Sequence, residues 1–134
     1  MDKVYNHKQS ENKWYNFWEE KGYFKPEINP AGKPFTIILP LPNASGKMHT
    51  GNVLMIAIED LLVRWKRMQG YSALWVPGTD HAGTETQVTF ERELKKQGKS
   101  RLDFSREELY QKIWDFVQEN KQNIEDQIRM MGAS

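Results

Sequence analysis

The chain has 134 residues, of which 38% are hydrophobic and 28% charged, so it is long enough for one domain with an apolar core. Nineteen basic and eighteen acidic residues give a formal net charge of +1, which excludes a whole-chain field that would collect nucleic acid or lipid by itself. The absence of cysteine excludes disulfides and thiolate zinc sites. No membrane-length apolar run or signal peptide is present, which predicts a cytoplasmic protein without a membrane partner.

The first predicted element is a short amphipathic helix over residues 10–21. Phe17 and Trp18 follow Trp14 by three and four residues, so the three rings share one face of this helix. Such a face is typical of core packing or docking. A platform for stacking nucleic-acid bases is the alternative, and the small number of interleaved basic residues disfavours it. We expect a packing arm over residues 1–33, which ends in a turn-rich segment.

A βαβ unit is predicted next. Short apolar runs at residues 35–39 and 72–76 indicate buried strands, and the apolar spacing over residues 50–69 indicates a helix between them. Prolines and glycine keep regular structure out of residues 40–48. Because the two strands of such a unit run parallel, the loops after them, at 40–48 and 77–83, should lie near each other at one edge of the sheet.

The remainder of the chain is predicted to be helical. Residues 83–96 fit a helix only loosely, whereas Ser105 and Glu108 have the spacing of a capping box before a long amphipathic helix that runs to about Met131. A doubly wound domain needs several parallel strands, and only two convincing ones are found. The fold is therefore interpreted as α/β, an incomplete Rossmann-like parallel-sheet nucleotide-binding fold, and the chain as truncated.

The segment at residues 46–52, Gly-Lys-Met-His-Thr-Gly-Asn, leads from a loop into a helix whose amino-terminal N–H groups favour a phosphate. His49 and Asn52 add side-chain donors, and Gly51 lets a flat ligand such as a purine lie against the backbone. A structural alternative stays open, in which Gly51 only eases packing and His49 only begins the helix. The segment is not a Walker loop, because Leu41 occupies the first glycine position.

The segment at residues 75–83, Trp-Val-Pro-Gly-Thr-Asp-His-Ala-Gly, ends a strand in a turn and presents a carboxylate. Asp80 could hold an ammonium group, whose charge it would cancel. The open alternative is that Asp80 caps a helix beginning near Ala82. His81 and Glu85 are four residues apart, but without a third ligand nearby no metal site is predicted.

Taken together, the two segments resemble a known family. Residues 40–52 resemble the first signature region of class I aminoacyl-tRNA synthetases, and residues 75–83 resemble a segment typical of valyl-tRNA synthetases. The arm, the helix segment 64–70 and the closing residues 132–134 are similar to that family as well. The chain is thereby identified as an amino-terminal fragment of a member of the valyl-tRNA synthetase family.

The resemblance implies ATP-dependent activation of valine, followed by transfer of the valyl group to tRNA-Val. It implies catalytic roles for His49 and Asn52, and ATP binding by His49, Gly51 and Asn52. The residues that it assigns to the amino-acid pocket are Pro40, Leu41, Pro42, Asn43 and Asp80, and among them Asp80 holds the ammonium group. Mg²⁺ is expected with the ATP phosphates, without a protein ligand in this chain. The resemblance further implies a monomer when intact, with residues 34–134 as the first half of the catalytic domain.

Departures from the family pattern keep two alternatives open. Asn52 stands where a second histidine is usual, and Leu41 stands where a proline is usual. A Lys-Met-Ser-Lys-Ser-type loop, an editing domain and an anticodon-binding region are missing, so we expect that the chain alone does not aminoacylate tRNA. The alternatives are another class I synthetase for an aliphatic amino acid and a non-catalytic nucleotide-binding or interaction module derived from such an enzyme.

Overall fold

The computed structural model describes residues 5–134, apart from the side chains of Lys8 and Asn12. The first four residues of the predicted arm lie outside this range. Two compact units are formed, one from residues up to 39, 50–77 and 127–134, and the other from residues 40–49 and 78–126. No helix in the described range is both long and apolar enough to cross a membrane.

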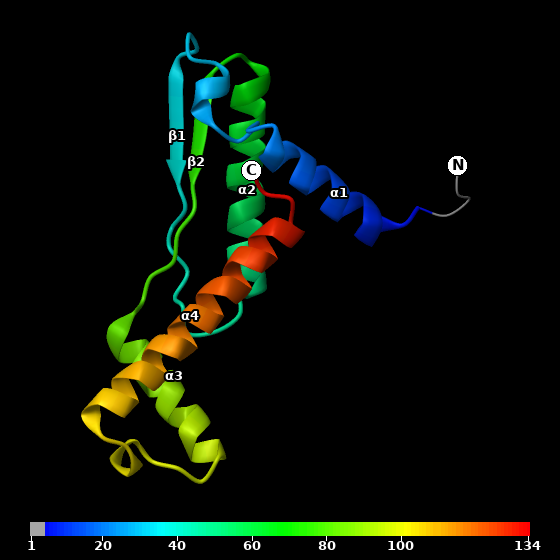
Figure 1. The fold of residues 1–134 in the computed structure, drawn as a ribbon. Helices are drawn as coiled ribbons and strands as arrows, with labels where there is room; N and C mark the ends of the chain where they lie inside the picture. Colours follow the sequence, from blue (N-terminus) through cyan, green and yellow to red (C-terminus); the bar gives the residue numbers. More distant parts are fainter. Residues whose placement is uncertain (1–4) are drawn as a thin grey trace. The chain divides into compact units, whose positions relative to one another are not determined.

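The sheet of the first unit consists of β1 (Pro34–Ile38) and β2 (Ser72–Val76), the two strands found in the described residues. They pair in parallel (Figure 1), and in this register Phe35 lies opposite Ala73. The predicted first strand was placed one residue too late, at residues 35–39. Leu39 nevertheless extends the pairing, because its N–H donates to the carbonyl oxygen of Val76 at 3.0 Å. Both predicted strands and their parallel direction are confirmed.

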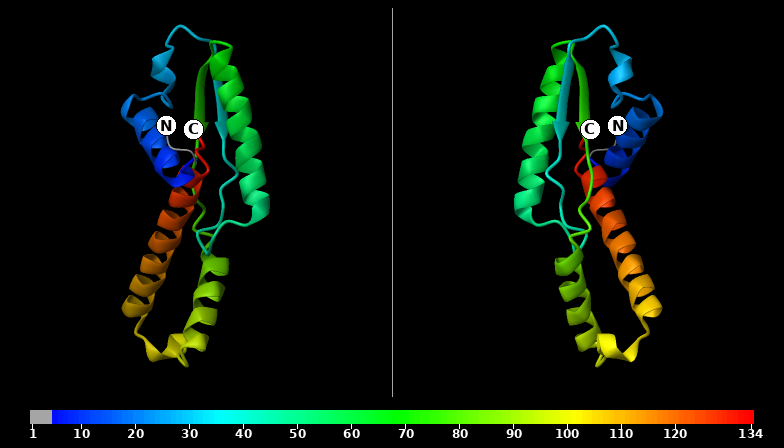
Figure 2. Two further views of the ribbon diagram at one scale, coloured as in Figure 1. Left: turned by 90° about the vertical axis from the view of Figure 1, so that its right-hand side faces the viewer. Right: turned by 90° about the vertical axis from the view of Figure 1, so that its left-hand side faces the viewer.

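The crossover between the strands is α2 (Thr50–Met68), which lies along the sheet (Figures 1 and 2). Ile56 and Val63 of this helix are fully buried. On β2, the indole Nε1 of Trp75 donates a 2.9 Å hydrogen bond to Glu59 of the same helix. The helix and the strands thus form the predicted βαβ unit, the core element of an incomplete Rossmann-like α/β fold.

A second apolar stripe on α2 is exposed. Its members recur three or four residues apart and are Leu54, Ile58, Leu61, Trp65 and Met68. Parallel sheets and their crossover helices normally have both sides covered. The stripe is therefore what an incomplete doubly wound fold leaves uncovered.

The arm contains α1 (His7–Glu20), which begins three residues before the predicted helix. The reason is Asn6, whose side chain accepts the N–H of Gln9 and caps the first turn. Farther along, the rings of Tyr15 and Phe24 lie 5.4 Å apart. The predicted packing role is confirmed only in part, since Trp14 remains 49% exposed.

A short 3-10 helix, η1 (Pro26–Ile28), begins the turn-rich segment before β1. Asn29 donates from Nδ2 to the carbonyl oxygen of Gly70 at 2.6 Å, and this joins the segment to the turn between α2 and β2. A Cβ atom at Gly32 would lie 2.6 Å from both the Gly70 oxygen and the Ser72 nitrogen. Glycine is required here because two stretches of backbone approach closely.

The second unit contains α3 (Gly83–Lys96), η2 (Arg101–Asp103) and most of α4 (Arg106–Met130). The loosely predicted helix α3 is regular, with Thr86, Phe90 and Leu94 buried on one face. Phe90 packs against Phe116 of α4, with ring centroids 5.6 Å apart. The predicted capping box is confirmed, since Ser105 and Glu108 exchange hydrogen bonds of 2.9 and 3.2 Å.

Candidate functional site

The two loops that follow the strands lie beside each other, as predicted, and they also pair. Asn43 and Asp80 form an isolated parallel bridge. The N–H of Ala44 donates to the carbonyl oxygen of Asp80 at 2.7 Å, and the N–H of Asp80 donates to that of Pro42 at 3.0 Å. Because Ala44 and Pro42 are buried, the bridge holds the exposed Asn43 and Asp80 side chains on a fixed backbone.

Four of the five residues predicted to bind an amino acid belong to this pairing. Pro42, Asn43 and Asp80 form it directly. Leu41 lies against Gly78, where an added Cβ would be 2.8 Å from Leu41 Cδ2. The fifth residue, Pro40, lies on the strand side of Leu41 and is exposed. The apolar side chain of Leu41 and the carboxylate of Asp80 are thus presented by adjacent loops.

The carboxylate of Asp80 is oriented by the backbone that follows it. Its Oδ1 accepts the N–H of Ala82 at 2.8 Å. Ala82 has φ 46°, the single positive φ of a non-glycine residue among those described, and α3 begins after it. The alternative role of Asp80 as a helix cap is met only loosely, because this bond goes to the residue before the first turn. A carboxylate offers about four lone-pair sites, so one such bond leaves capacity for an ammonium group.

Glu85, in the first turn of α3, bonds to the first loop. Its Oε2 accepts from Asn43 Nδ2 at 2.5 Å, and its Oε1 accepts from Ser45 Oγ at 3.4 Å. Sequence spacing linked Glu85 only to His81, as an improbable metal pair. His81 instead packs edge-on against Trp114, with ring centroids 6.0 Å apart. Within the described residues, no three His, Asp or Glu side chains gather as metal ligands.

The residues predicted to bind ATP lie at the start of α2. His49 immediately precedes the helix, and Gly51 and Asn52 are its second and third residues. The amino terminus of a 19-residue helix carries N–H groups and a positive dipole end that favour an anion. A helix end of this kind favours a phosphate, and Gly51 places no side chain there.

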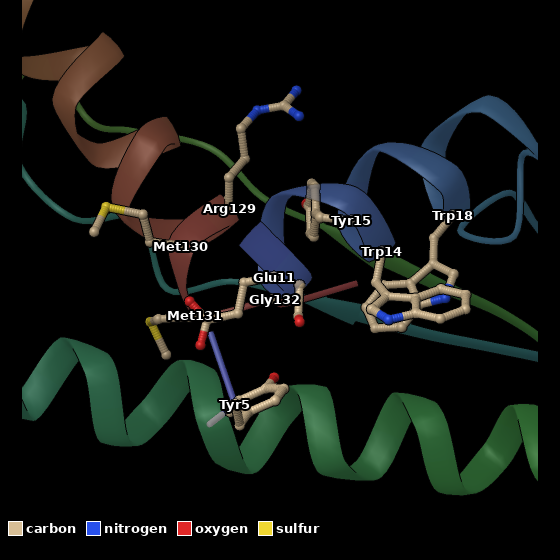
Figure 3. Close-up of a pocket in the computed structure, with 10 residues that line it drawn as sticks. Tyr5, Glu11, Trp14, Tyr15, Trp18, Arg129, Met130, Met131 and Gly132 are labelled. Atoms are coloured by element: carbon tan, nitrogen blue, oxygen red, sulfur yellow. The ribbon is translucent and has the colours of Figure 1, made fainter. Parts of the chain in front are cut away.

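The described residues also form several pockets outside these predicted contacts. One, of about 400 Å³, is lined by α1 and by the end of α4, with Trp14 and Trp18 on one side and Met130 and Met131 on the other (Figure 3). The second, of about 230 Å³, borders the Asp80 loop through His81 and Gly83 and is lined on the α4 side by Tyr110 and Trp114. The sequence reasoning found neither pocket.

A parallel βαβ unit whose strand-end loops present a helix amino terminus and a carboxylate defines an α/β protein of the nucleotide-binding class. Comparison with known proteins gives the family. Residues 13–134 match the family described as tRNA synthetases class I (I, L, M and V). The chain belongs to this family.

Its relatives include valine–tRNA ligases. It is 48% identical to that of Dehalococcoides mccartyi over 134 residues, which is all of this chain and 15% of the relative. It is 42% identical to that of Clostridium acetobutylicum, again over all of this chain and 15% of the relative. The chain thus spans about 15% of the length of these relatives.

A solved structure supports the fold. The LeuRS of Agrobacterium radiobacter K84, determined as a ternary complex with tRNA and LeuAMS, superposes with a TM-score of 0.76. The match covers 97% of this chain and 15% of that one, at 24% identity. The α/β fold of a class I synthetase is therefore shown for this chain.

Proposed function

We propose that this chain is the first part of the catalytic domain of a valine–tRNA ligase. The observation that carries the proposal is the Asn43–Asp80 bridge, which joins the loop at residues 40–48, called the signature loop below, to the loop at residues 77–83 that bears the Asp80 carboxylate. Similarity to valine–tRNA ligases over the whole of this chain, which is 15% of their length, favours valine over other aliphatic amino acids. We also propose the division of the chain into an amino-terminal helical arm, residues 1–33, and the first half of the catalytic domain, residues 34–134.

In this proposal Asp80 binds the ammonium group of valine by charge and hydrogen bonding. Pro40, Leu41, Pro42 and Asn43 line the amino-acid pocket. The structure supports these roles by the pairing of the two loops and by the bond from Ala82, which fixes one carboxylate oxygen. A hydrogen bond to a charged group contributes about 1.5–3 kcal/mol, so Asp80 should dominate the affinity of this part of the site.

The chemistry requires the valine carboxylate to lie beside the α-phosphate of ATP. A carboxylate oxygen attacks the phosphorus, the bond to the leaving pyrophosphate breaks, and valyl-adenylate forms. His49, Asn52 and the amino terminus of α2 stabilise the negative charge on the phosphates, and Gly51 lies under the adenine. Mg²⁺ enters with the ATP phosphates rather than on a ligand set of this chain. The valyl group then passes to the terminal adenosine of tRNA-Val, and AMP leaves.

The parent protein is proposed to be a cytoplasmic monomer that supplies the remaining triphosphate and tRNA contacts. The 134-residue chain alone is not expected to aminoacylate tRNA. A non-catalytic nucleotide-binding or interaction module is the competing function, suggested by Asn52 at the signature position.

The test is calorimetric titration of the 134-residue chain with a non-hydrolysable valyl-adenylate analogue. We expect saturable binding that Asp80→Asn weakens about 10- to 100-fold, because the variant keeps an acceptor for Ala82 and removes the charge. His49→Ala should also weaken binding. Asp126→Asn is the matched control, since Asp126 is an exposed carboxylate that accepts from Gln122 on α4. Absence of binding would favour the interaction module, and equal binding of a leucyl analogue would contradict valine specificity.

A further inference from the structure

Within the described residues, Glu85 of α3 accepts hydrogen bonds from two side chains of the loop at residues 40–48, and its geometry assigns it a role. Asn43 Nδ2 lies 2.5 Å from one carboxylate oxygen, and Ser45 Oγ lies 3.4 Å from the other. We propose that Glu85 is a positioning residue of the amino-acid site, which orients the side-chain amide of Asn43 and holds residues 43–45 against α3. This inference rests on the proposed function, because the role of Asn43 in the amino-acid pocket is itself part of that proposal.

The position of Glu85 in the helix makes this role possible. Glu85 is the third residue of α3, where a glutamate of a capping box would reach back to the N–H of the residue before the helix. That N–H belongs to Ala82 and is bonded to Asp80 instead. With this N–H engaged by Asp80, the Glu85 carboxylate reaches across to the signature loop, 42 positions earlier in the chain.

The helix end that carries Glu85 is itself firmly held. The neighbouring Thr86 is 1% exposed, and its hydroxyl donates to the carbonyl oxygen of His81 at 2.5 Å. The amino-terminal position also favours a negative side chain through the helix dipole. The helix end that carries the exposed Glu85 side chain is thus held in place, and the bonds from Asn43 and Ser45 attach the loop to it.

The bond determines which way the Asn43 amide faces. A carboxylate accepts and does not donate, so the NH₂ group of Asn43 must face Glu85 and the carbonyl oxygen must face away. The backbone of Asn43 is paired with that of Asp80, and this pairing fixes the position of the Asn43 Cα atom from which the side chain extends. Without Glu85, both orientations of the amide become accessible and an acceptor in the pocket is lost part of the time.

The first experiment needs no ligand. The side-chain amide resonances of Asn43 and the exchange rates of the Ala44 and Asp80 N–H groups are measured by NMR in the 134-residue chain. Glu85→Ala should shift the Asn43 amide resonances and speed both exchange rates at least several-fold. Glu93→Ala is the matched control, because Glu93 lies on the same helix and pairs with Lys96 on the surface. Unchanged Asn43 resonances in Glu85→Ala would overturn the proposal.

The second experiment measures affinity for the valyl-adenylate analogue, in variants whose helix content matches that of the unmodified chain. Glu85→Ala should weaken binding about 10-fold, the effect of one hydrogen bond to a charged group. Asn43→Asp should weaken it more, since two carboxylates then face each other. The double variant Asn43→Asp with Glu85→Gln restores a donor–acceptor pair, with the amide and the carboxylate exchanged. If this variant recovers the exchange rate of the Ala44 N–H but not the affinity, the Asn43 amide itself is needed for binding.

The two experiments separate failure of this inference from failure of the proposed function. If the unmodified chain binds no analogue while Glu85→Ala still disturbs Asn43, the valine site is wrong and the role of Glu85 in amino-acid binding falls with it. If the analogue binds and Glu85→Ala changes neither the resonances nor the affinity, only the positioning role is refuted. In the full-length ligase, the positioning role predicts a higher KM for valine in Glu85→Ala, with kcat for pyrophosphate exchange changed much less.

Discussion

The phenolic hydroxyl of Tyr15 on α1 donates a 3.0 Å hydrogen bond to the carbonyl oxygen of Ala133, 118 positions later. Ala133 is 2% exposed, so this acceptor is out of reach of bulk water. Next to it, both the backbone N–H and the hydroxyl of Ser134 donate to Asp60 of α2 at 2.8 Å. The arm and α2 therefore hold the closing residues together within one compact unit.

Replacing Tyr15 by Phe should lower the free energy of unfolding by about 1 kcal/mol, because it leaves a buried carbonyl without its donor and keeps the ring. Burial raises the pKa of Tyr15, with a smaller contribution from Glu19, so the hydroxyl stays protonated well beyond neutral pH. Urea unfolding followed by circular dichroism measures the effect. The control is Tyr110→Phe, since Tyr110 is largely exposed. Equal stability of Tyr15→Phe and the unmodified chain would show that the arm is not held by this bond.

The capping box of α4 should make stability depend on pH in the acid range. Hydrogen bonds from Ser105 lower the pKa of Glu108 below its ordinary value of 4.5. A carboxyl with a lowered folded pKa stabilises the fold above its unfolded pKa, and this contribution is lost as pH falls below about 4.5 through the folded pKa. The chain should therefore lose more stability than Glu108→Gln between pH 6 and about pH 3. Glu107→Gln, an exposed neighbour in the same turn, should follow the unmodified chain, and parallel curves for all three would contradict the assignment.

The elements could be predicted where apolar residues alone decide them. Both strands were located to within one residue because short apolar runs are bounded by turn residues. The start of α1 was missed because the cap is Asn6, a polar residue that lies ahead of the aromatic pattern. Helix α3 was predicted weakly because one member of its buried face is Thr86, whose hydroxyl is satisfied by the carbonyl oxygen of His81. Hydropathy patterns count such a residue as polar and exposed.

The candidate site could be predicted only as far as local sequence reaches. The approach of the two loops followed from parallel strand direction, a topological rule. The bond from Asn43 to Glu85 joins residues 42 positions apart, and no spacing rule connects them. The two apolar stripes of α2 were likewise indistinguishable in sequence, although only the one with Ile56 and Val63 is buried.

Gly32→Ala should destabilise the chain by about 1–3 kcal/mol or more, because its new methyl group would meet backbone atoms of Gly70 and Ser72 that cannot move separately from β2. Gly46→Ala is the matched control, since nothing lies within 4 Å of a Cβ atom there. Thermal unfolding of both variants separates a steric effect from the general effect of replacing glycine. If Gly32→Ala is as stable as Gly46→Ala, the close approach at this turn is not a constraint.

The exposed stripe of α2 should make the isolated 134-residue chain associate with itself. Leu54, Leu61 and Met68 are 63%, 66% and 80% exposed, and contiguous apolar surface of this kind is normally covered by another part of a protein or a partner. The double variant Leu54→Lys and Leu61→Lys should therefore remain monomeric to higher concentration, as measured by sedimentation velocity, without loss of helix content. Ile56→Lys tests the opposite face of the same helix. Because Ile56 is fully buried, that variant should unfold the βαβ unit instead. If the Leu54 and Leu61 variants unfold the chain as well, both stripes of α2 pack in solution and the helix is not half-covered.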